Sequence, residues 1–364
     1  MPLNEAPFTL GGRKALLLAD GEFSVFGSKT ATCYVRYRGD DVVAVVDRSQ
    51  AGRSAQDVLG FGGAIPVVSD VVEALVHDPD VAVVGVAPSG GQLTAALHEQ
   101  ILQCVQAGLD VVSGLHSFLS DDAVLAQAAR QSGSRFWDVR SVPGTTRIGS
   151  GAGCTTGAMS VLAVGSDCNV GKMTATVELY REAKRRKIAT AWAATGQTGM
   201  MLRGRGIAID RVVADFIGGA VEELVEYEAA DKQIVFVEGQ GSIIHPGFAG
   251  VALGLMYGVM PDCMVLVHAA SRRTIGDTEV AMPPLAELVR LHEALMQPFK
   301  ASPVVAIAVN TFGLGDAEAR ESVARIERQT GLPARDPLRH GAEDLVDAIL
   351  GRQARGGRQD GDSV

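Results

Sequence analysis

A glycine-bounded loop followed by a lysine is the feature of this sequence that most directly indicates chemistry. The loop begins at Gly165, ends at Gly171 and is followed at once by Lys172. Glycine has no Cβ and adopts unusual φ angles freely, so backbone N–H groups can converge on a phosphate there. A helix that begins at Lys172 adds unpaired N–H groups and the positive end of its dipole. We therefore predict a phosphate-binding loop between a strand and a helix.

The loop departs from the usual G-x-x-x-x-G-K-[ST] spacing, because five residues separate its two glycines. Met173 stands where a Mg²⁺-binding hydroxyl is expected, and Thr174 comes one position later, about 100° further round the helix. This pattern favours phosphate binding over Mg²⁺-dependent hydrolysis, and we predict no metal ligand. A plain glycine turn is the simpler alternative. The expected cofactor-binding residues are Gly165, Asp167, Cys168, Asn169, Val170, Gly171, Lys172, Met173 and Thr174.

A carboxylate and a histidine follow a later apolar run and are the expected catalytic residues. Glu238 ends that run, and His245 lies seven positions on in a glycine-rich loop. Imidazole has an unperturbed pKa of about 6.5, which suits a general base, so His245 is the first candidate. Glu238 is expected to orient it or to replace it, although a purely structural role in the loop is the simpler interpretation. The N–H groups from Gly239 to Ser242 could stabilise an oxyanion, each worth roughly 3 kcal/mol.

Other polar residues near the predicted strand ends suit recognition of a carboxylate. Arginine presents a planar fork that matches a carboxylate, so one or two arginines are expected to bind substrate, although any single one could be a surface charge. Asp215 is equally compatible with a site and with a structural role. The expected substrate-binding residues are Gln197, Thr198, Arg203, Arg205, Asp215, Gln240, Ser242, Arg272 and Arg273.

Continuous apolar runs alternate with amphipathic stretches in the first half of the chain, as in parallel strands covered on both faces by helices. One helix is expected over 91–107. The predicted strands are 15–19, 42–47, 65–68, 81–87, 110–113 and 135–139. This pattern predicts a Rossmann-like, doubly wound domain. It lacks the G-x-G-x-x-G of dinucleotide enzymes, so we give Asp47, at the end of the second strand, a surface or capping role rather than a ribose-binding one.

The second half repeats the alternation around the phosphate loop and predicts a P-loop NTPase-like α/β domain. Expected strands are 161–164, 189–194, 233–237, 263–268 and 304–310, with helices at 172–187, 316–329 and 342–350. Ligands gather at the carboxyl ends of such strands, where the loops 165–172, 195–199, 238–246 and 269–273 meet. The expected organisation is a first domain over 1–142, an interdomain segment over 143–157, a second domain over 158–350 and a disordered tail over 351–364.

Composition narrows the class of protein. The 364 residues carry a formal net charge of −9, which argues against a nucleic-acid partner. The five cysteines are scattered without C-x-x-C, as suits a reducing cytoplasm. No secretory signal is expected at the start, and the apolar region 251–270 is interrupted by Pro261 and Asp262, so no membrane span is predicted. We expect a cytoplasmic homo-oligomer that acts on a small molecule.

Several blocks of sequence resemble one known family. GSDCNVGKMT, ATGQTG, DFIGGAVEELV and VEGQGSIIHPGFAGVALGL are similar to the signature blocks of the DgcN-like family, a former domain-of-unknown-function family associated with D-glutamate N-acetyltransferase activity. VVAVVDRSQAG, DVVSGLHSFLSDD and FWDVR resemble its Rossmann-like N-terminal domain. The resemblance runs from about Lys14 to Leu350. More distantly, the G-x₅-G-K loop and EGQG are similar to dethiobiotin synthetase, an ATP- and Mg²⁺-dependent enzyme with a hydroxyl residue directly after its lysine.

The DgcN-like resemblance implies that acetyl-CoA donates an acetyl group to the amine of D-glutamate, in D-amino acid metabolism. A phosphate loop without the Mg²⁺ hydroxyl suits coenzyme A, whose acyl transfer needs no metal. A covalent acetyl intermediate on Cys168 would need a neighbouring base that the sequence does not supply. The alternatives are an ATP/Mg²⁺-dependent ligase or kinase acting on a small carboxylate, as the dethiobiotin synthetase likeness implies, and a nucleotide-responsive regulatory protein.

Overall fold

The computed structural model describes residues 3–25, 27–87, 91–142, 144, 146–155 and 157–356. The described chain divides into two compact units. The N-terminal unit comprises 3–142 together with Gln197–Ala208, and the C-terminal unit comprises Gly144–Gly196 and 209–356. Each unit contains its own six-stranded parallel sheet, which confirms the predicted two-domain α/β fold.

The N-terminal unit has the strand order β4-β3-β2-β5-β6-β7, with every neighbouring pair parallel. Counted along the chain, the first strand lies beside the second on one side and beside the fourth on the other, as in dinucleotide-binding Rossmann folds. The strands are β2 (Ala15–Leu18), β3 (Val42–Val46), β4 (Val67–Val68), β5 (Val81–Val84), β6 (Asp110–Ser113) and β7 (Phe136–Asp138). The helices within 3–142 are α1 (Lys29–Arg38), α2 (Ala55–Leu59), α3 (Val71–Ala74), α4 (Ala95–Gln106) and α5 (Ala123–Ser132).

Local capping explains where one of these helices begins. The expected helix over 91–107 is shorter at its start, because the Thr94 side chain accepts a hydrogen bond from the N–H of Leu97 and α4 begins only at Ala95. Asp47 is not a surface residue, which was one of the two roles expected for it, but it does cap main-chain N–H groups. Its fully buried carboxylate accepts hydrogen bonds from the N–H groups of Phe23 and Ser49, among others, and so ties together the loops that follow β2 and β3.

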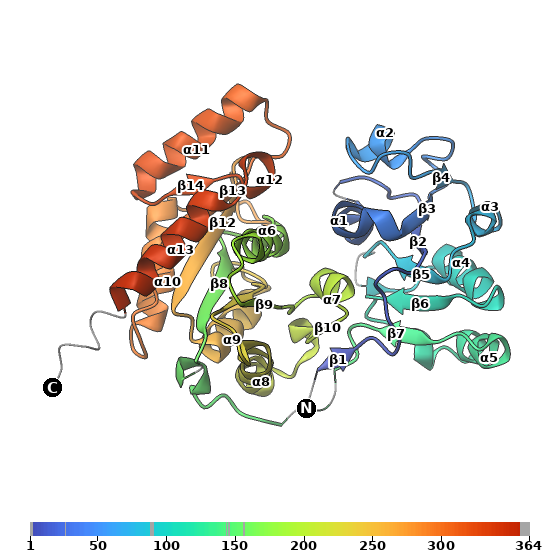
Figure 1. Ribbon diagram of the computed structural model, residues 1–364, viewed down its shortest axis with the longest axis horizontal. Coiled ribbons are helices and arrows are strands. Elements are labelled where there is room, and N and C mark those ends of the chain that lie inside the picture. Colours follow the sequence, from blue (N-terminus) through green and yellow to red (C-terminus); the bar gives the residue numbers. More distant parts are fainter. Residues whose placement is uncertain are drawn as a thin grey trace. The chain divides into compact units, whose positions relative to one another are not determined.

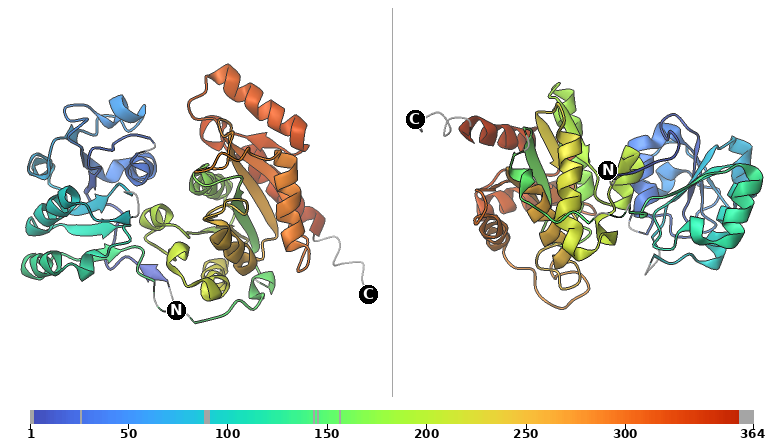
Figure 2. Two further views of the ribbon diagram at one scale, coloured as in Figure 1. Left: turned by 180° about the vertical axis from the view of Figure 1, so that it is seen from behind. Right: turned by 90° about the horizontal axis from the view of Figure 1, so that it is seen from below.

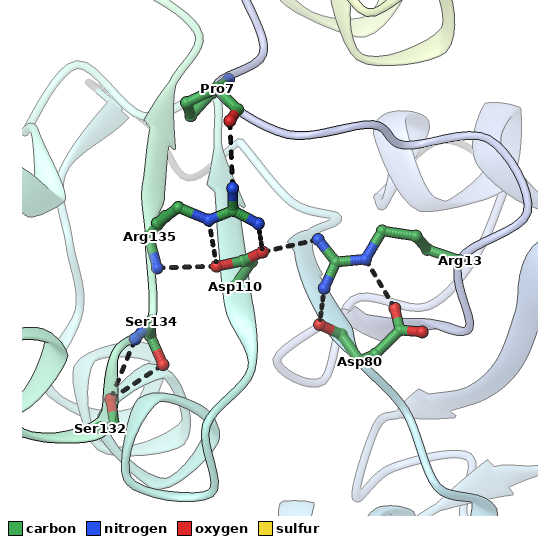
Figure 3. Close-up of polar contacts among 7 residues, drawn as sticks. All are labelled: Pro7, Arg13, Asp80, Asp110, Ser132, Ser134 and Arg135. Carbon is green, nitrogen blue, oxygen red and sulfur yellow. Dashed lines mark hydrogen bonds and ion pairs between the residues drawn. The ribbon is translucent and has the colours of Figure 1, made fainter.

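A network of charged side chains around the buried Asp110 joins the amino ends of the strands in this unit (Figure 3). Asp110, at the start of β6, binds Arg13 at 2.6 Å and Arg135 at 2.7 Å. Arg13 also binds the Asp80 carboxylate at 2.8 Å just before β5. Despite burial, which acts in the opposite direction, hydrogen bonds from Arg135 and Arg13 lower the pKa of Asp110. This network stabilises the amino ends of the strands, whereas ligands in such folds bind at the carboxyl ends.

The C-terminal unit has the strand order β14-β13-β12-β8-β11-β9, again all parallel. The strand before the phosphate loop, β8, therefore lies in the middle of the sheet between β12 and β11. The strands are β8 (Met159–Gly165), β9 (Thr190–Ala193), β11 (Ile234–Val237), β12 (Cys263–Ala269), β13 (Val304–Asn310) and β14 (Ala334–Arg335). The helices are α6 (Lys172–Arg185), α8 (Ile217–Ala229), α9 (Ala249–Val259), α10 (Leu285–Met296), α11 (Asp316–Thr330), α12 (Pro337–His340) and α13 (Glu343–Gly356).

Helices cover both faces of this sheet (Figures 1 and 2). α6 and α13 lie on one face, and α8 and α9 lie together on the other. Right-handed crossovers account for the opposite placement of α6 and α8, which connect strands in opposite directions across the sheet. Alternate residues of β8, β11, β12 and β13 form a core with the apolar sides of α6 and α13. Among the helices of the described chain, none combines the length and apolar character that crossing a bilayer requires.

Three stretches depart from the predicted organisation. Residues 197–208 were expected in the second domain, but they form α7 (Gln197–Arg203) and β10 (Arg205–Gly206) in the N-terminal unit, where β10 pairs with β1 (Asn4–Glu5) and α7 packs on α1. The tail was expected to be disordered from 351, but α13 continues to Gly356. The rest of that prediction, 357–364, lies outside the described residues.

The third stretch is the expected interdomain segment, 143–157, which is held against the C-terminal unit. The fully buried carboxylate of Glu222, on α8, accepts hydrogen bonds from the N–H groups of Ser150, Gly151 and Ala152 and binds Arg147. Three main-chain donors are satisfied by one carboxylate, so this part of the segment is fixed in place. Pro143, Thr145 and Thr156 lie outside the described residues.

Candidate phosphate-binding site

The phosphate loop connects β8 to α6 and depends on glycine at both ends. β8 ends at Gly165 and α6 begins at Lys172, as the sequence predicted. Gly171 precedes the helix with φ of 107°, a conformation that L side chains rarely adopt. A Cβ on Gly165 would come within 2.7 Å of Nζ of Lys172. The glycines thus give the backbone its turn and leave room for the lysine side chain.

Lys172 is folded over its own loop. Its side chain is buried, and Nζ donates a 2.8 Å hydrogen bond to the carbonyl oxygen of Asp167. On the other side, a Cβ on Gly239 would lie 3.1 Å from Cδ of Lys172, so the loop after β11 also leaves space for this side chain. The structure therefore positions the ammonium group against the main chain of the loop.

The N-cap residue of α6 is Gly171, which has no side chain that could accept a hydrogen bond from the first N–H groups of the helix. The first N–H groups of a helix have no intrahelical partner, and they attract anions together with the positive helix dipole. Met173, directly after the lysine, is buried and offers no oxygen, whereas Thr174 is half-buried. The usual hydroxyl ligand for Mg²⁺ is thus replaced by an apolar side chain packed into the core.

Asp167 holds the loop in shape. Its fully buried carboxylate accepts hydrogen bonds of 2.7 Å from the N–H groups of Cys168 and Gly276, and Nε of Arg272 lies 3.3 Å from it. Arg272 also donates to the carbonyl oxygen of Cys168 at 3.3 Å. Asp167 and Arg272 therefore join the loop to the segment after β12.

His245 lies beside this loop. One of its ring nitrogens, a carboxylate oxygen of Asp167 and Sγ of Cys168 lie within 4.8 Å of one another, a grouping of side-chain types that can hold a metal ion. The structure thus brings an imidazole near Cys168, for which the sequence alone indicates no neighbouring base. Burial is the main cause that raises the pKa of the Cys168 thiol, so the protonated thiol is favoured.

The hydrogen bonds of His245 define its tautomer. The N–H of Gly247 donates to Nδ1 at 3.1 Å, so Nδ1 carries no proton and the neutral ring is protonated on Nε2. The His245 ring also packs against Phe248, with ring centroids 4.8 Å apart. The expected general base therefore presents a donor rather than an acceptor at its other nitrogen.

Glu238 is buried at the end of β11 and is bound from the neighbouring loop. Its carboxylate accepts hydrogen bonds from the N–H of Thr195 at 3.3 Å and from Nε2 of Gln240 at 3.2 Å. Nearby, Ser242 donates to the carbonyl oxygen of Ser166 at 3.3 Å. Glu238, Gln240 and Ser242, all expected site residues, thus lie in one loop whose contacts reach both the segment after β9 and the phosphate loop.

The remaining expected substrate-binding residues are divided between the two units. Arg273 is exposed and donates to the carbonyl oxygen of Ala270 at 3.2 Å, and Asp215 is exposed in the short helix η7 (Ala214–Phe216). The N-terminal unit contains Gln197, Thr198, Arg203 and Arg205, which sit in α7 and β10. The expectation that 195–199 is a loop is corrected, because α7 begins at Gln197.

Sequence reasoning missed three supports of the loop. Nδ1 of His268, at the end of β12, lies 2.9 Å from the hydroxyl of Ser166, and burial, followed by nearby arginines, lowers the pKa of His268 to about 4. Gly276 binds Asp167, and Asn310, at the end of β13, donates to the carbonyl oxygen of Val170 at 3.3 Å. His268 and Asn310 lie at the carboxyl ends of β12 and β13, and that position, where ligands bind in such sheets, could have marked them.

The fold and this loop define the class of protein, a two-domain α/β protein with a Rossmann-like domain and a phosphate-loop domain. The model of the Rossmann-like DUF1611_N domain matches residues 48–142, and that of the DUF1611_C P-loop domain matches residues 147–346; both are described as domains of unknown function. The chain belongs to the DUF1611 family.

Curated relatives carry a more specific name. The chain is 38% identical over 269 residues, which are 73% of this chain and 80% of the relative, to a D-glutamate N-acetyltransferase of Tritonibacter scottomollicae. It is 35% identical over 266 residues, 72% of this chain and 79% of the relative, to a protein of the same name from Pseudoalteromonas sp.. With such relatives, the chain is an enzyme of the acyltransferase class.

A solved structure shares the whole architecture. The crystal structure of a DUF1611 family protein from Anabaena variabilis matches with a TM-score of 0.89 and 38% sequence identity. The match covers 93% of this chain and 100% of that one. The fold described above is therefore shared with that member of the family.

Proposed function

We propose that this enzyme transfers the acetyl group of acetyl-CoA to the amine of D-glutamate, as part of D-amino acid metabolism. The relatives with this activity in their names support the acceptor and the reaction. The observation that carries the proposal is the start of α6, where Lys172 and the N-terminus of the helix suit a phosphate while Met173 replaces the Mg²⁺ hydroxyl. Coenzyme A supplies phosphates, and its thioester needs no metal to react.

In this proposal the loop residues from Gly165 to Thr174 hold a phosphate of coenzyme A. The ammonium group of D-glutamate must lose a proton before its nitrogen attacks the thioester carbonyl, so a base is required. We assign this role to Glu238, because an ionised carboxylate only accepts hydrogen bonds, whereas neutral His245 presents the N–H of Nε2. The N–H groups of Gly239 to Ser242 are proposed to stabilise the tetrahedral oxyanion.

The two arginines after β12 receive different roles. Arg272 is engaged with Asp167 and with the carbonyl oxygen of Cys168, so it maintains the loop. Arg273 is exposed beside it, and we propose that its guanidinium binds a carboxylate of the substrate. Arg273→Lys should then raise KM for D-glutamate with a smaller change in kcat, because lysine keeps the charge but loses the planar fork.

A thiol-release assay tests the proposed reaction directly. Purified full chain with acetyl-CoA and D-glutamate should release free CoA thiol and form N-acetyl-D-glutamate, with and without EDTA, and L-glutamate serves as the matched acceptor control. No CoA release above background from folded protein would contradict the proposal. Formation of ADP from ATP, dependent on Mg²⁺ and a small carboxylic acid, would instead favour the ligase or kinase alternative.

We further propose that the enzyme is cytoplasmic and forms a homo-oligomer. Light scattering of the purified full chain measures the oligomeric state.

A further inference from the structure

His245 is shielded from solvent at the phosphate loop, although it is distant from that loop in the sequence. Only 4% of the residue is exposed. Its main chain is held in the loop just before α9, because it donates to the carbonyl oxygen of Ser242 at 3.1 Å and accepts from the N–H of Ala249 at 3.0 Å. A ring nitrogen lies within 4.8 Å of the Asp167 carboxylate and of Sγ of Cys168. The imidazole is therefore a rigid part of the wall around the loop.

The ring presents a proton that nothing in the described chain accepts. A main-chain N–H can only donate, so the 3.1 Å bond from Gly247 leaves Nδ1 without a proton and puts the proton of the neutral ring on Nε2. Nε2 is buried and has no hydrogen-bond partner among the described residues. A buried donor without an acceptor is costly, and such groups in proteins are commonly completed by a ligand or an ordered water.

The charges around the loop favour an anionic acceptor, because Asp167, the carboxylate within 4.8 Å of the ring nitrogen, is paired with Arg272. The same loop contributes the N–H groups at the start of α6, the positive end of the helix dipole and the ammonium group of Lys172. A metal ion is disfavoured at Nε2, because a neutral ring that binds a metal through Nε2 must carry its proton on Nδ1, against the N–H of Gly247. Asp167, the second potential ligand, already accepts from two main-chain N–H groups.

We propose that His245 is a phosphate-binding residue, whose neutral imidazole donates the N–H of Nε2 to a phosphate oxygen of the ligand in the loop. This inference rests on the proposed phosphate ligand and assigns His245 to binding instead of proton removal. The side chain would add a neutral donor from the β11 loop to the donors that the phosphate loop itself supplies. It would thereby help to recognise a phosphate without adding positive charge.

Binding of simple phosphate ligands to the full chain tests this role. The probes are inorganic pyrophosphate and CoA, measured by calorimetry, with wild type, His245→Ala, His245→Gln and the control His340→Ala, which alters the histidine at the end of α12. His245→Ala should bind both probes about 10- to 100-fold more weakly, as expected for loss of a hydrogen bond to a charged group. His245→Gln keeps an N–H donor and should stay within about 3-fold of wild type, as should the control.

Nitrogen NMR of histidine-labelled wild type gives a readout that does not depend on any variant folding. It should show Nδ1 of His245 unprotonated and Nε2 protonated, with the Nε2 signal moving when pyrophosphate is added. A proton on Nδ1, equal affinities for wild type and His245→Ala, or Zn²⁺ binding that His245→Ala abolishes would each overturn the inference. Failure of acetyl transfer with His245-dependent pyrophosphate binding intact would overturn the proposed reaction and leave this inference standing.

Discussion

Nζ of Lys172 donates a 2.8 Å hydrogen bond to the carbonyl oxygen of Asp167, within the same loop. The lysine is thus already placed where a phosphate would meet the start of α6, and little side-chain ordering remains to be done on binding. Because the acceptor in this bond is a neutral carbonyl group, a phosphate oxygen can compete for the ammonium group with the advantage of charge.

Replacing this lysine should weaken phosphate binding more than it weakens folding. Lys172→Met removes the charge and keeps most of the apolar stem, so CoA affinity should fall about 10- to 100-fold, in line with loss of a charge-assisted hydrogen bond. Calorimetry with CoA measures the affinity, and a thermal melt of the unliganded variant is the control. Unchanged CoA affinity in folded Lys172→Met would place the phosphates elsewhere.

The close approach of Gly239 to β8 makes this position intolerant of any side chain. A Cβ there would lie 1.7 Å from the carbonyl oxygen of Ala163, an overlap that only a backbone shift can relieve. Gly239→Ala should therefore cost about 3 kcal/mol of unfolding free energy. At Gly250, in α9, an added Cβ would have nothing within 4 Å, and Gly250→Ala should be neutral or stabilising by about 0.5 kcal/mol. Urea denaturation of the pair checks both values, and similar stabilities would contradict this packing.

Glu222 should hold the interdomain segment in place, and the neighbouring Glu226 provides a control for this role. Glu222→Gln removes the charge that receives three main-chain N–H groups and Arg147, and should cost about 3 kcal/mol. Glu226 binds the same arginine from a more exposed position, so Glu226→Gln should cost less than about 1 kcal/mol. Chemical denaturation gives the energies, and limited proteolysis should cut the segment near 147–152 faster only in Glu222→Gln.

Two buried histidines should make the C-terminal unit acid-sensitive. Burial is the main cause that lowers the pKa values of His268 and His292 to about 4, below the unfolded value of about 6.5. Between these values the unfolded chain binds more protons, so stability is unaffected above about pH 6.5 and falls as the pH drops toward 4. The loss should approach on the order of 3 kcal/mol for each histidine at pH 4.

Urea unfolding between pH 7.5 and 4.5 measures this dependence. His292→Gln removes one titrating group, and the slope of unfolding free energy against pH should then decrease by up to about 1.4 kcal/mol per pH unit in the acid range. The half-buried His340 provides the control, because His340→Gln should leave the slope unchanged. A slope that is the same in wild type and His292→Gln would show that this histidine is not buried in its neutral form.

Much of the fold could be predicted because parallel strands and their helices leave local signals. The run that became β8, the glycine turn at Gly171 and the helix beginning at Lys172 are each encoded by neighbouring residues. The placement of 197–208 was wrong because β10 pairs with β1, which is distant in the sequence and lies near its start. The early end predicted for the last helix was also wrong, because the polar, glycine-containing stretch after 350 is typical of disorder but continues α13 to Gly356.

For the site, residue types along the chain identified the loop, the lysine and the nearby polar segments, since backbone conformation depends on the nature of each residue and its immediate neighbours. Chain folding alone determined which of these groups meet. Asp167 meets Gly276 and Arg272, and His245 lies at the loop, because β8 is flanked by β11 and β12. The proton of the neutral His245 ring is on Nε2 because the N–H of Gly247 points to Nδ1. A tautomer depends on hydrogen bonds in three dimensions. For this reason the sequence alone predicts a base at His245, whereas the folded structure supports a residue that donates a hydrogen bond to phosphate.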